Sequence, residues 1–429
     1  MKITILIFSF LLSCISFAQE PITLQQCLDL ASANSLQLTT ENSGVQTAQL
    51  NRKYHAFSLL PNLNATAGLN TSFGRRVDPF TNTFATNTVN SQSFGLSSGM
   101  TLFNGFRYLN NRKALDYTIA QQELSVQTKQ NDLQIRLIET YIELCKQTVQ
   151  IELAQLRIEK YNQIQAIQLL LIRSGKIASI DTLKSRNSLL NEELLLTKLV
   201  SAKRLKILQL NFLMGVPLST DHSFVLSSVY AITTIPQFAE SIELERLAIE
   251  AQMNAIQLKT DKATILPTLS LNGNVGTGFS TNNKDYTQVG NPTKSYNDQI
   301  TQNLYEGIGF YLSVPLFNRG TWFKTKELNR VKVNELTQSK QLVELNLEMR
   351  KMEREQQLVT KKAELIQVEQ IGVNLQLIYD KTVLLYNEGR TTYTEVEETF
   401  LAWQIKLVDL ETMKLEIQRL LLFTANKPN

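Results

Sequence analysis

The chain has 429 residues, with 43 basic and 39 acidic side chains and a net charge of +4, which is far too small for a nucleic-acid-binding surface. A hydrophobic content of 43% excludes a disordered chain, and 17 glycines and 9 prolines, about half the usual share, predict few turns and long elements. Two histidines and three cysteines exclude a His-rich or Cys-rich metal cage. We therefore expect neither an enzyme nor a bound cofactor or metal.

The first 18 residues have the pattern of an export signal. Lys2 precedes an apolar run from Ile3 to Leu12, and Ser16-Phe17-Ala18 is a small-x-small cleavage site. Cys14 lies in a context that resembles a lipoprotein cleavage box, so lipid anchoring at Cys14 is the alternative to cleavage after Ala18.

Cys27 and Cys145 lie in two separate helical patterns, each among apolar neighbours. We predict that both are buried free thiols and that they form no disulfide, although the export signal points to an oxidising compartment.

Three short motifs each occur twice. The pairs are Leu59-Leu60-Pro61 with Ile265-Leu266-Pro267, Leu102-Phe103-Asn104 with Leu316-Phe317-Asn318, and Ser174-Gly175 with Glu388-Gly389. The first pair is offset by 206 residues and the other two by 214, so the second copy carries an insertion of eight residues between its first two motifs. The chain is a duplicated unit.

Both copies have the same order of predicted elements. A helical stretch ends at a Leu-Pro pair, because the residue before a proline is forced out of the helical region. Two strands joined by a polar loop follow, then a long helix that ends at a glycine and a shorter helix that returns. The predicted ranges are 23–60, 62–74, 93–103, 106–174 and 182–213 in the first copy, and 240–266, 268–280, 305–317, 321–388 and 394–424 in the second.

These patterns divide the chain into a signal peptide (1–18), a first repeat (19–213), a connector (214–239) and a second repeat (240–429). The connector, with two prolines, has no pattern that assigns it a role beyond a belt around the helices.

The second strand of each hairpin alternates apolar residues with small or polar ones. The apolar positions are Phe94, Leu96, Met100 and Leu102 in the first copy and Ile308, Phe310, Leu312, Val314 and Leu316 in the second. This period of two predicts a sheet with one apolar face and one face in water.

The long helices are the least ordinary feature. Residues 106–174 hold no proline or glycine, and only Gly372 interrupts 321–388, so each segment can form a helix of about 100 Å. Apolar residues recur at steps of three, four or seven, which predicts coiled-coil seams. The seam positions are Ile135, Ile138, Ile142, Cys145, Val149, Leu153 and Leu156 in the first helix, and Met349, Met352, Val359, Ala363, Ile366, Val373, Leu377 and Leu384 in the second.

Four predicted strands cannot close a membrane barrel, since the smallest such barrels need about eight. An open edge in lipid leaves unpaired backbone groups, each costing several kcal/mol. Closure must therefore be shared between copies of the chain. Two copies would fill the bore with side chains, so an open channel favours three or more.

Several motifs now stand in a particular order. The first helix opens with Ile22-Thr23-Leu24-Gln25-Gln26-Cys27-Leu28, a Leu-Pro pair precedes each strand hairpin, Leu-Phe-Asn-Gly at 102–105 follows the first one, and both helical hairpins turn at a glycine. In this order, and over essentially the whole chain after the signal, the sequence resembles the TolC family of outer-membrane efflux proteins.

The resemblance implies a mainly α fold with a membrane β-barrel portion. It implies a homotrimer, with a twelve-stranded barrel in the outer membrane and a twelve-helix tunnel in the periplasm. Its function would be an export duct for substrates handed over by a periplasmic adaptor protein and an inner-membrane transporter of the RND or ABC type. Its other partner would be outer-membrane lipid, and no nucleic acid is implied.

The resemblance also assigns residues to a narrow entrance at the helix tips. Glu395 and Glu398 match acidic positions of the family, and their spacing of three places both on one helix face. Repeated around an axis, each carboxylate would become a ring that attracts cations and sets selectivity. Tyr386 matches a tyrosine that ties the closed entrance to the acid of the first copy, here Asp181.

Residues at the two glycine turns are candidates for docking an adaptor. They are Gly175, Lys176, Ile177 and Ala178 in the first copy and Gly389, Arg390, Thr391 and Thr392 in the second. The alternative is that they only cover their own turns. Thr391 replaces a basic residue that the family carries two positions after the second glycine, and Arg390 comes one position early.

Simpler readings stand beside these roles. Asp181 has the chemistry of a helix N-cap, Thr394 with Glu397 has the form of a capping box, and Glu395 and Glu398 in a first helical turn would favour the helix dipole. At the level of function, the alternative is a periplasmic or outer-membrane-associated coiled-coil scaffold that is not a channel. A hydrolase is disfavoured because neither histidine, His55 nor His222, lies in a recognisable catalytic or ligand spacing.

Overall fold

The computed structural model describes residues 22–77, 82–85, 88–173, 179–220, 222 and 240–424. The predicted signal peptide, Cys14, the first glycine turn and most of the predicted connector lie outside these residues. The chain forms two compact units, one of residues 1–42, 124–244 and 342–429, the other of residues 43–123 and 245–341. Each unit holds parts of both predicted repeats, and the repeat boundaries remain a prediction.

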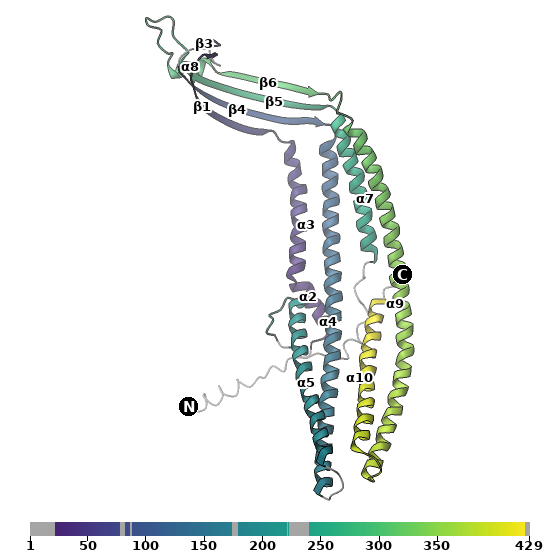
Figure 1. Ribbon diagram of the computed structural model, residues 1–429. Helices are drawn as coiled ribbons and strands as arrows, with labels where there is room; N and C mark the ends of the chain where they lie inside the picture. The colour runs from purple at the N-terminus through teal and green to yellow at the C-terminus, as the bar shows by residue number, and fades with distance from the viewer. Residues whose placement is uncertain are drawn as a thin grey trace, which may run out of the picture. The chain divides into compact units, whose positions relative to one another are not determined.

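Helices make up most of the described chain (Figure 1). They are α2 (Leu24–Asn34), α3 (Leu36–Tyr54), α4 (Arg107–Arg173), α5 (Ser179–Met214), α7 (Glu240–Lys262), α8 (Tyr296–Gln302), α9 (Thr321–Asn387) and α10 (Tyr393–Thr424), with short 3-10 turns η1 (His55–Leu59) and η2 (Ala263–Ile265). The predicted long helices are confirmed, because α4 and α9 each run for 67 residues. None of the described helices is both long and apolar enough to cross a membrane.

The helix predicted over 23–60 is interrupted at Ser35, whose backbone is extended with φ −64° and ψ 117°. The N–H of Ser35 donates to the carbonyl of Ala31 at 3.1 Å, and its own carbonyl accepts from the N–H of Thr39 at 3.1 Å. Ser35 thus ends α2 and starts α3. Both predicted Leu-Pro ends are confirmed, since Leu60 and Leu266 are extended with ψ 148° and 154°.

The core of the first unit lies where α2, α4, α5 and α10 meet. Its fully buried side chains include Leu24, Leu137, Tyr141 and Leu210. The hydroxyl of Tyr141 donates to the carbonyl of Ile22 at 3.0 Å, which satisfies its one polar group inside this core.

Cys27 and Cys145 both lie in this core, buried and free, as predicted. Burial raises the pKa of each thiol to about 12.

The sheet of the second unit has four antiparallel strands in the order β1-β4-β5-β6. They are β1 (Asn62–Ser72), β4 (Val89–Asn104), β5 (Thr268–Ser280) and β6 (Tyr305–Ser313). The two predicted hairpins are confirmed, and they pair with each other through β4 and β5. Within the described residues β1 and β6 each have one paired neighbour, so both edges of the sheet are open.

The register confirms one apolar face within the strands, but β6 ends at Ser313, so the assignment of Val314 and Leu316 to this face was wrong. Leu96 lies opposite Ala65 and Val275, and Leu271 lies opposite Met100 and Phe310. Residues directly opposite one another share a face, so these side chains project from the same side of the sheet.

The other face carries mainly small and polar residues, for example Gly95 opposite Thr66 and Gly276, together with Tyr305 and Tyr311 of β6. A register shift between Thr101 and Phe103 takes Leu102 out of the alternation, and the assignment of Leu102 to the apolar face was wrong.

The eight-residue insertion of the second copy lies in its strand-to-strand loop, which has 24 residues (281–304) against 16 (73–88) in the first copy. The sequence predicted only that this loop is polar, and the structure shows that it contains α8. The side chain of Gln299 on α8 accepts from the N–H of Ser280 at 2.9 Å and donates to its carbonyl at 3.1 Å. It thereby takes the place of a paired strand at the end of β5, beyond Gly276, where the pairing with the first residue of β6, Tyr305, stops. The loop of the first copy carries the short strands β2 (Arg76–Val77) and β3 (Phe84–Ala85).

Gly105 joins β4 to α4 and shows why the Leu-Phe-Asn-Gly motif ends in glycine. Its φ is +64°, and a Cβ added there would lie 2.9 Å from the Cβ of Leu266 and 3.1 Å from the carbonyl oxygen of Ala263. A larger residue would be strained and would clash with the end of the second-copy helix.

The two predicted seams differ. In the first, Ile138, Ile142, Cys145 and Val149 are buried, whereas Leu156 at its end is 57% exposed. In the second, the large seam side chains of α9 are all at least half exposed. The seam on α9 is therefore present as a pattern but has no packing partner within the described chain.

Candidate functional site

The second helical hairpin turns at Gly389. The N–H of Gly389 donates to the carbonyl of Tyr386 at 2.9 Å, and the N–H of Arg390 donates to the carbonyl of Leu385 at 2.9 Å. These two bonds form a Schellman motif, which needs a left-handed residue, and Gly389 has φ +77°. The glycine tip predicted for the second copy is confirmed.

The following helix begins one residue before its predicted start. The hydroxyl of Thr392 accepts from the N–H of Glu395 at 3.4 Å, and the hydroxyl of Thr391 donates to the carboxylate of Glu395. Thr392 therefore caps α10, and the capping box predicted for Thr394 with Glu397 is wrong.

The predicted entrance residues are only partly described. Glu395 and Glu398 are exposed near the start of α10, and their role as charged rings remains a prediction. Tyr386 is half-buried at the end of α9. Asp181 is the third residue of α5, inside its first turn, so it is not the N-cap. Its side chain lies outside the described part, and a contact between Asp181 and Tyr386 remains a prediction.

The predicted adaptor-docking residues likewise divide into two groups. Gly175, Lys176, Ile177 and Ala178 lie outside the described residues, whereas Gly389, Arg390 and Thr392 are exposed and Thr391 is partly buried. Docking at either turn remains a prediction.

An aromatic cluster that was not predicted holds the tip of the second hairpin together. Tyr379 stacks on Trp403 with ring centroids 5.6 Å apart and packs at 5.3 Å against Phe400. Val396 completes the buried part. Five aromatic residues occur in the sequence from Tyr379 to Trp403, but nothing in their spacing distinguished a core from a surface.

The tip of the first hairpin is held by polar contacts instead. Arg157 on α4 donates to Glu192 on α5 at 2.9 Å, and their side chains are only 9% and 14% exposed. Ser185 on α5 donates to the side-chain oxygen of Gln168 at 2.6 Å, and both residues are fully buried.

One carboxylate joins the two hairpins. Glu397 on α10 accepts hydrogen bonds from the hydroxyl of Tyr161 on α4, at 3.3 Å, and from the hydroxyl of Ser188 on α5. The ring of Tyr161 also meets the ring of Phe400 edge-on, at 6.1 Å. Burial is the main cause that raises the pKa of Tyr161, and the nearby Glu397 carboxylate adds to it. Tyr161 therefore stays a neutral donor.

A small cavity of about 80 Å³ lies beside this joint, between α4, α9 and α10. Tyr379, Tyr386 and Tyr393 line it with Ile164 and Val396. Tyr393 is 2% exposed, and burial raises the pKa of its hydroxyl. The space matches about two or three water molecules.

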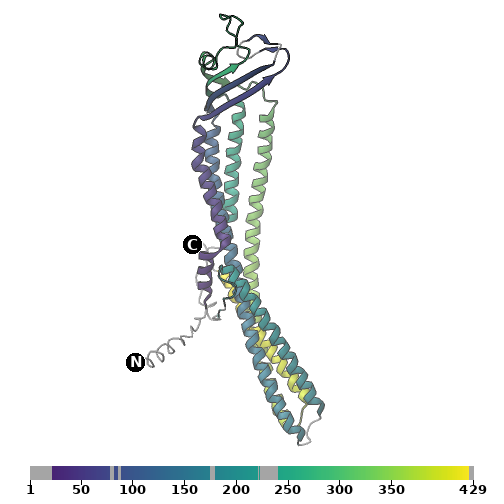
Figure 2. The same ribbon diagram turned by 90° about the vertical axis from the view of Figure 1, so that its left-hand side faces the viewer.

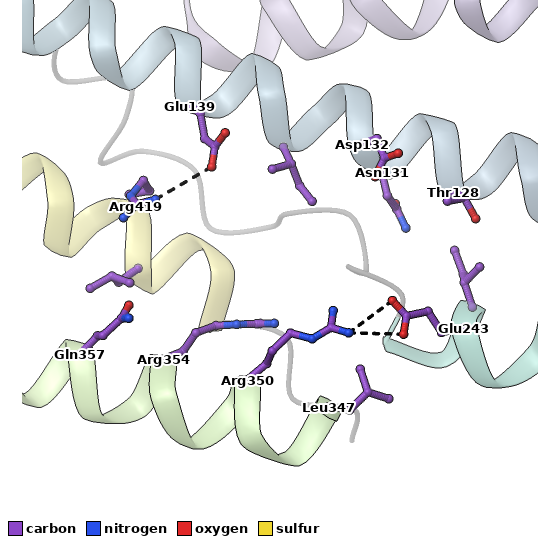
Figure 3. Close-up of a pocket in the computed structure, with 13 residues that line it drawn as sticks. Thr128, Asn131, Asp132, Glu139, Glu243, Leu347, Arg350, Arg354, Gln357 and Arg419 are labelled. Atoms are coloured by element: carbon purple, nitrogen blue, oxygen red, sulfur yellow. Dashed lines mark hydrogen bonds and ion pairs between the residues drawn. The ribbon is translucent and has the colours of Figure 1, made fainter. Parts of the chain in front are cut away.

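A larger cleft of about 410 Å³ lies in the same unit, between α4, α7, α9 and α10 (Figure 3). Arg350 on α9 donates to both carboxylate oxygens of Glu243 at 3.4 and 3.5 Å, and Arg419 on α10 lies 3.9 Å from Glu139 on α4. Opposite charges therefore face each other across this cleft.

Among the described residues, no group of three or more His, Cys, Asp or Glu side chains is placed to hold a metal ion.

Known proteins resemble this chain both in sequence and in fold. Residues 27–216 match the family described as outer membrane efflux protein. Over this part the chain is similar to that family. It coincides almost entirely with the predicted first repeat, so the family predicted from the motifs is confirmed there. No curated protein sequence matches the chain.

Solved structures extend the likeness to the second repeat. CusC aligns with a TM-score of 0.75 over 95% of this chain and 92% of its own, at 14% identity. VceC from Vibrio cholerae gives 0.71 over 94% of each chain at 14% identity, and the CmeC outer membrane channel of Campylobacter jejuni gives 0.71 over 96% and 90% at 14% identity. The chain shares their fold over nearly its full length, and the predicted fold class is confirmed.

Proposed function

We propose that the chain is one subunit of an outer-membrane export duct, in which sister copies complete both a β-barrel and a helical tunnel. The family match and the fold shared with outer-membrane channels support this function and this location. The observation that carries the proposal is the exposed apolar seam of α9, together with the two open edges of the sheet.

The α9 seam points away from the helices of its own chain. Met352, Val359, Ile366 and Val373 recur every seven residues and are 64, 64, 66 and 64% exposed. Residues on the opposite side of α9 pack on α10, for example Tyr379, which is 6% exposed. A stripe of this length in water is an interaction surface, and its heptad spacing fits another helix.

A second exposed stripe runs along α5. Its members are Ile180, Leu183, Leu190, Leu194, Leu205 and Phe212, each more than half exposed. The inward side of α5 carries Ser185 and Glu192 instead. Figure 1 draws α5, α4, α10 and α9 in that order, and Figure 2 shows α4 and α5 in front of α10. The two apolar stripes thus lie on the two outer helices of the layer.

In a closed ring of copies, the exposed apolar stripes of α5 and α9 and the open sheet edges at β1 and β6 are all covered. The α5 stripe of one copy meets the α9 stripe of the next, and β6 of one copy pairs with β1 of the next. Such a head-to-tail contact repeats until the ring closes. Three copies, each with four strands, give a twelve-stranded barrel with room for a bore. The apolar face of the sheet then contacts lipid and the small, polar face lines water.

In this duct the substrate passes without chemistry, and an adaptor at the hairpin tips connects it to an inner-membrane transporter that supplies the energy. The exposed residues around Gly389 are the docking candidates on the described side. Glu395 and Glu398 form carboxylate rings at the entrance, where they attract cations.

Single-channel recording in planar lipid bilayers tests this proposal. The purified mature protein is expected to insert and to conduct with a preference for cations. In the double variant Glu395→Ala, Glu398→Ala, the cation preference and the block by multivalent cations should both weaken. Unchanged selectivity would remove these two residues from the bore.

A membrane extraction separates the duct from the coiled-coil scaffold. A barrel stays in the outer-membrane fraction through washes with high salt and carbonate, whereas a peripheral scaffold is released. Release of the mature protein by either wash would contradict the duct.

A further inference from the structure

Three helices meet at the carboxylate of Glu397, near the tip of the first unit. Tyr161 comes from α4, Ser188 from α5 and Glu397 from α10. The first two helices form one hairpin, and α10 belongs to the other. A single acceptor therefore holds both helices of the first hairpin against the second.

The two donors are positioned independently of Glu397. Arg157 lies one helical turn from Tyr161, and Glu192 lies one turn from Ser188 on α5. The buried ion pair of Arg157 with Glu192 already joins α4 to α5 at this level. Loss of Glu397 would leave the first hairpin intact, because its own ion pair remains.

The acceptor is equally fixed from its own side. Val396 and Phe400 flank Glu397 on α10, and both are buried against Tyr379 on α9. The aromatic cluster therefore holds the second hairpin together whether or not Glu397 has partners.

Among the described residues, the joint between the hairpins at this level includes the two hydrogen bonds, the edge-on contact of Tyr161 with Phe400 and the side chains around the small cavity. Other polar contacts between the hairpins involve Glu416 and Arg419 of α10, 19 and 22 residues further along, at about 28 and 33 Å from Glu397 for a rise of 1.5 Å per residue. Of these contacts between the hairpins, the one at Glu397 lies nearest to the tips. Its loss should therefore have the largest effect on how far the tips separate.

We propose that Glu397 is the positioning residue that ties the two hairpins of one subunit together and keeps the entrance of the duct narrow. This role rests on the proposed function and assigns its regulation to a residue outside the exposed carboxylates at Glu395 and Glu398. Breaking the tie lets the two hairpins separate as rigid bodies, which widens the entrance.

The test uses full-length mature protein in planar bilayers, with Glu397→Ala, Glu397→Gln and the conservative pair Tyr161→Phe, Ser188→Ala. Asp409→Ala is the matched control, because this carboxylate on the same helix has its ion pair with Lys406 on its own helix. Relative to the wild type, Glu397→Ala should raise the ratio of open to closed time about tenfold, as expected for loss of a charge-assisted hydrogen bond. Glu397→Gln keeps a neutral acceptor and should give a smaller rise, and Asp409→Ala should give none.

A merely structural role predicts additive damage, whereas a tie predicts a saturating effect. Adding Tyr161→Phe and Ser188→Ala to Glu397→Ala should raise the open ratio no further, since all three changes break the same contact. If Glu397→Ala fails to fold, the variant with Tyr161→Phe and Ser188→Ala tests the tie by itself. Each of these substitutions removes only a hydroxyl oxygen and should leave the packing of the core intact.

The two proposals fail in different ways. If wild type and variants insert but none conducts, the duct itself is refuted. If all conduct and Glu397→Ala gates like the wild type, or its effect adds to that of the two donors, the tie is refuted and the duct stands.

Discussion

The exposed seam of α9 gives the sharpest test of assembly. The perturbation is a quadruple substitution of Met352, Val359, Ile366 and Val373 by alanine. Together these changes remove about ten side-chain heavy atoms, each worth about 0.8 kcal/mol when fully buried. Because the four side chains are 64 to 66% exposed in the single chain, about two thirds of that value, about 5 kcal/mol for each interface, remains to be gained on assembly.

A loss of about 5 kcal/mol weakens one interface more than a thousandfold. Light scattering on protein in mild detergent, across a dilution series, should show the quadruple variant dissociating while the wild type stays assembled. Alanine is the best helix former, so far-UV circular dichroism should be unchanged.

The matched control places four alanines one residue further along, where the side chains are exposed and polar. These positions are Glu353, Thr360, Gln367 and Asn374. Assembly of the quadruple seam variant at every dilution that the wild type survives would refute the reasoning, and so would equal dissociation of the control.

Two further predictions concern the sheet and the buried thiols. Phe310→Arg places a charge on the apolar face at a cost of about 2–4 kcal/mol in lipid, whereas Tyr311→Arg on the other face should be tolerated. Immunoblots of outer membranes should therefore show a reduced amount of the Phe310→Arg variant and a normal amount of the Tyr311→Arg variant. Equal amounts of the two variants would contradict the assignment of faces. Cys27 and Cys145 should resist alkylation at pH 8 in the folded protein and react after denaturation, because burial raises the pKa of both thiols to about 12. The folded state keeps these protons after the unfolded chain has lost them, so the free energy of unfolding should fall as pH rises from about 9 towards 12, and a Cys27→Ala, Cys145→Ala variant should show a shallower fall.

Much of the fold follows from local sequence because its signals are local. The two helices of 67 residues are predicted by the absence of proline and the near absence of glycine, and the strand hairpins by a Leu-Pro pair and a period of two. The break at Ser35 could not be predicted in this way, because no glycine or proline marks it and its cause is that Leu24, Leu28 and Leu38 must all reach one core. The displacement of Leu102 depends on a bulge that only the pairing of β4 with β5 reveals.

The contacts of the candidate site were harder to predict, because they join residues that are far apart in the sequence. Thr394 and Glu397 have the spacing of a capping box, so local pattern assigned Glu397 to its own helix. In the structure Thr392 is the cap, and Glu397 bonds to Tyr161 and Ser188, which lie 236 and 209 residues away in the sequence. No spacing rule connects such residues.

The two helical hairpins have different interiors in their described parts, and this difference suggests where motion occurs. Opening the first hairpin would expose the buried pair of Arg157 and Glu192, and breaking such a pair is costly when either charge stays buried. Opening the second would expose the aromatic cluster around Tyr379, which water cannot replace. The contact between the hairpins is weaker than either interior, because hydroxyl bonds to Glu397 can be exchanged for bonds to water at small net cost. Each hairpin should therefore move as a rigid unit, with the flexible point at the joint between them.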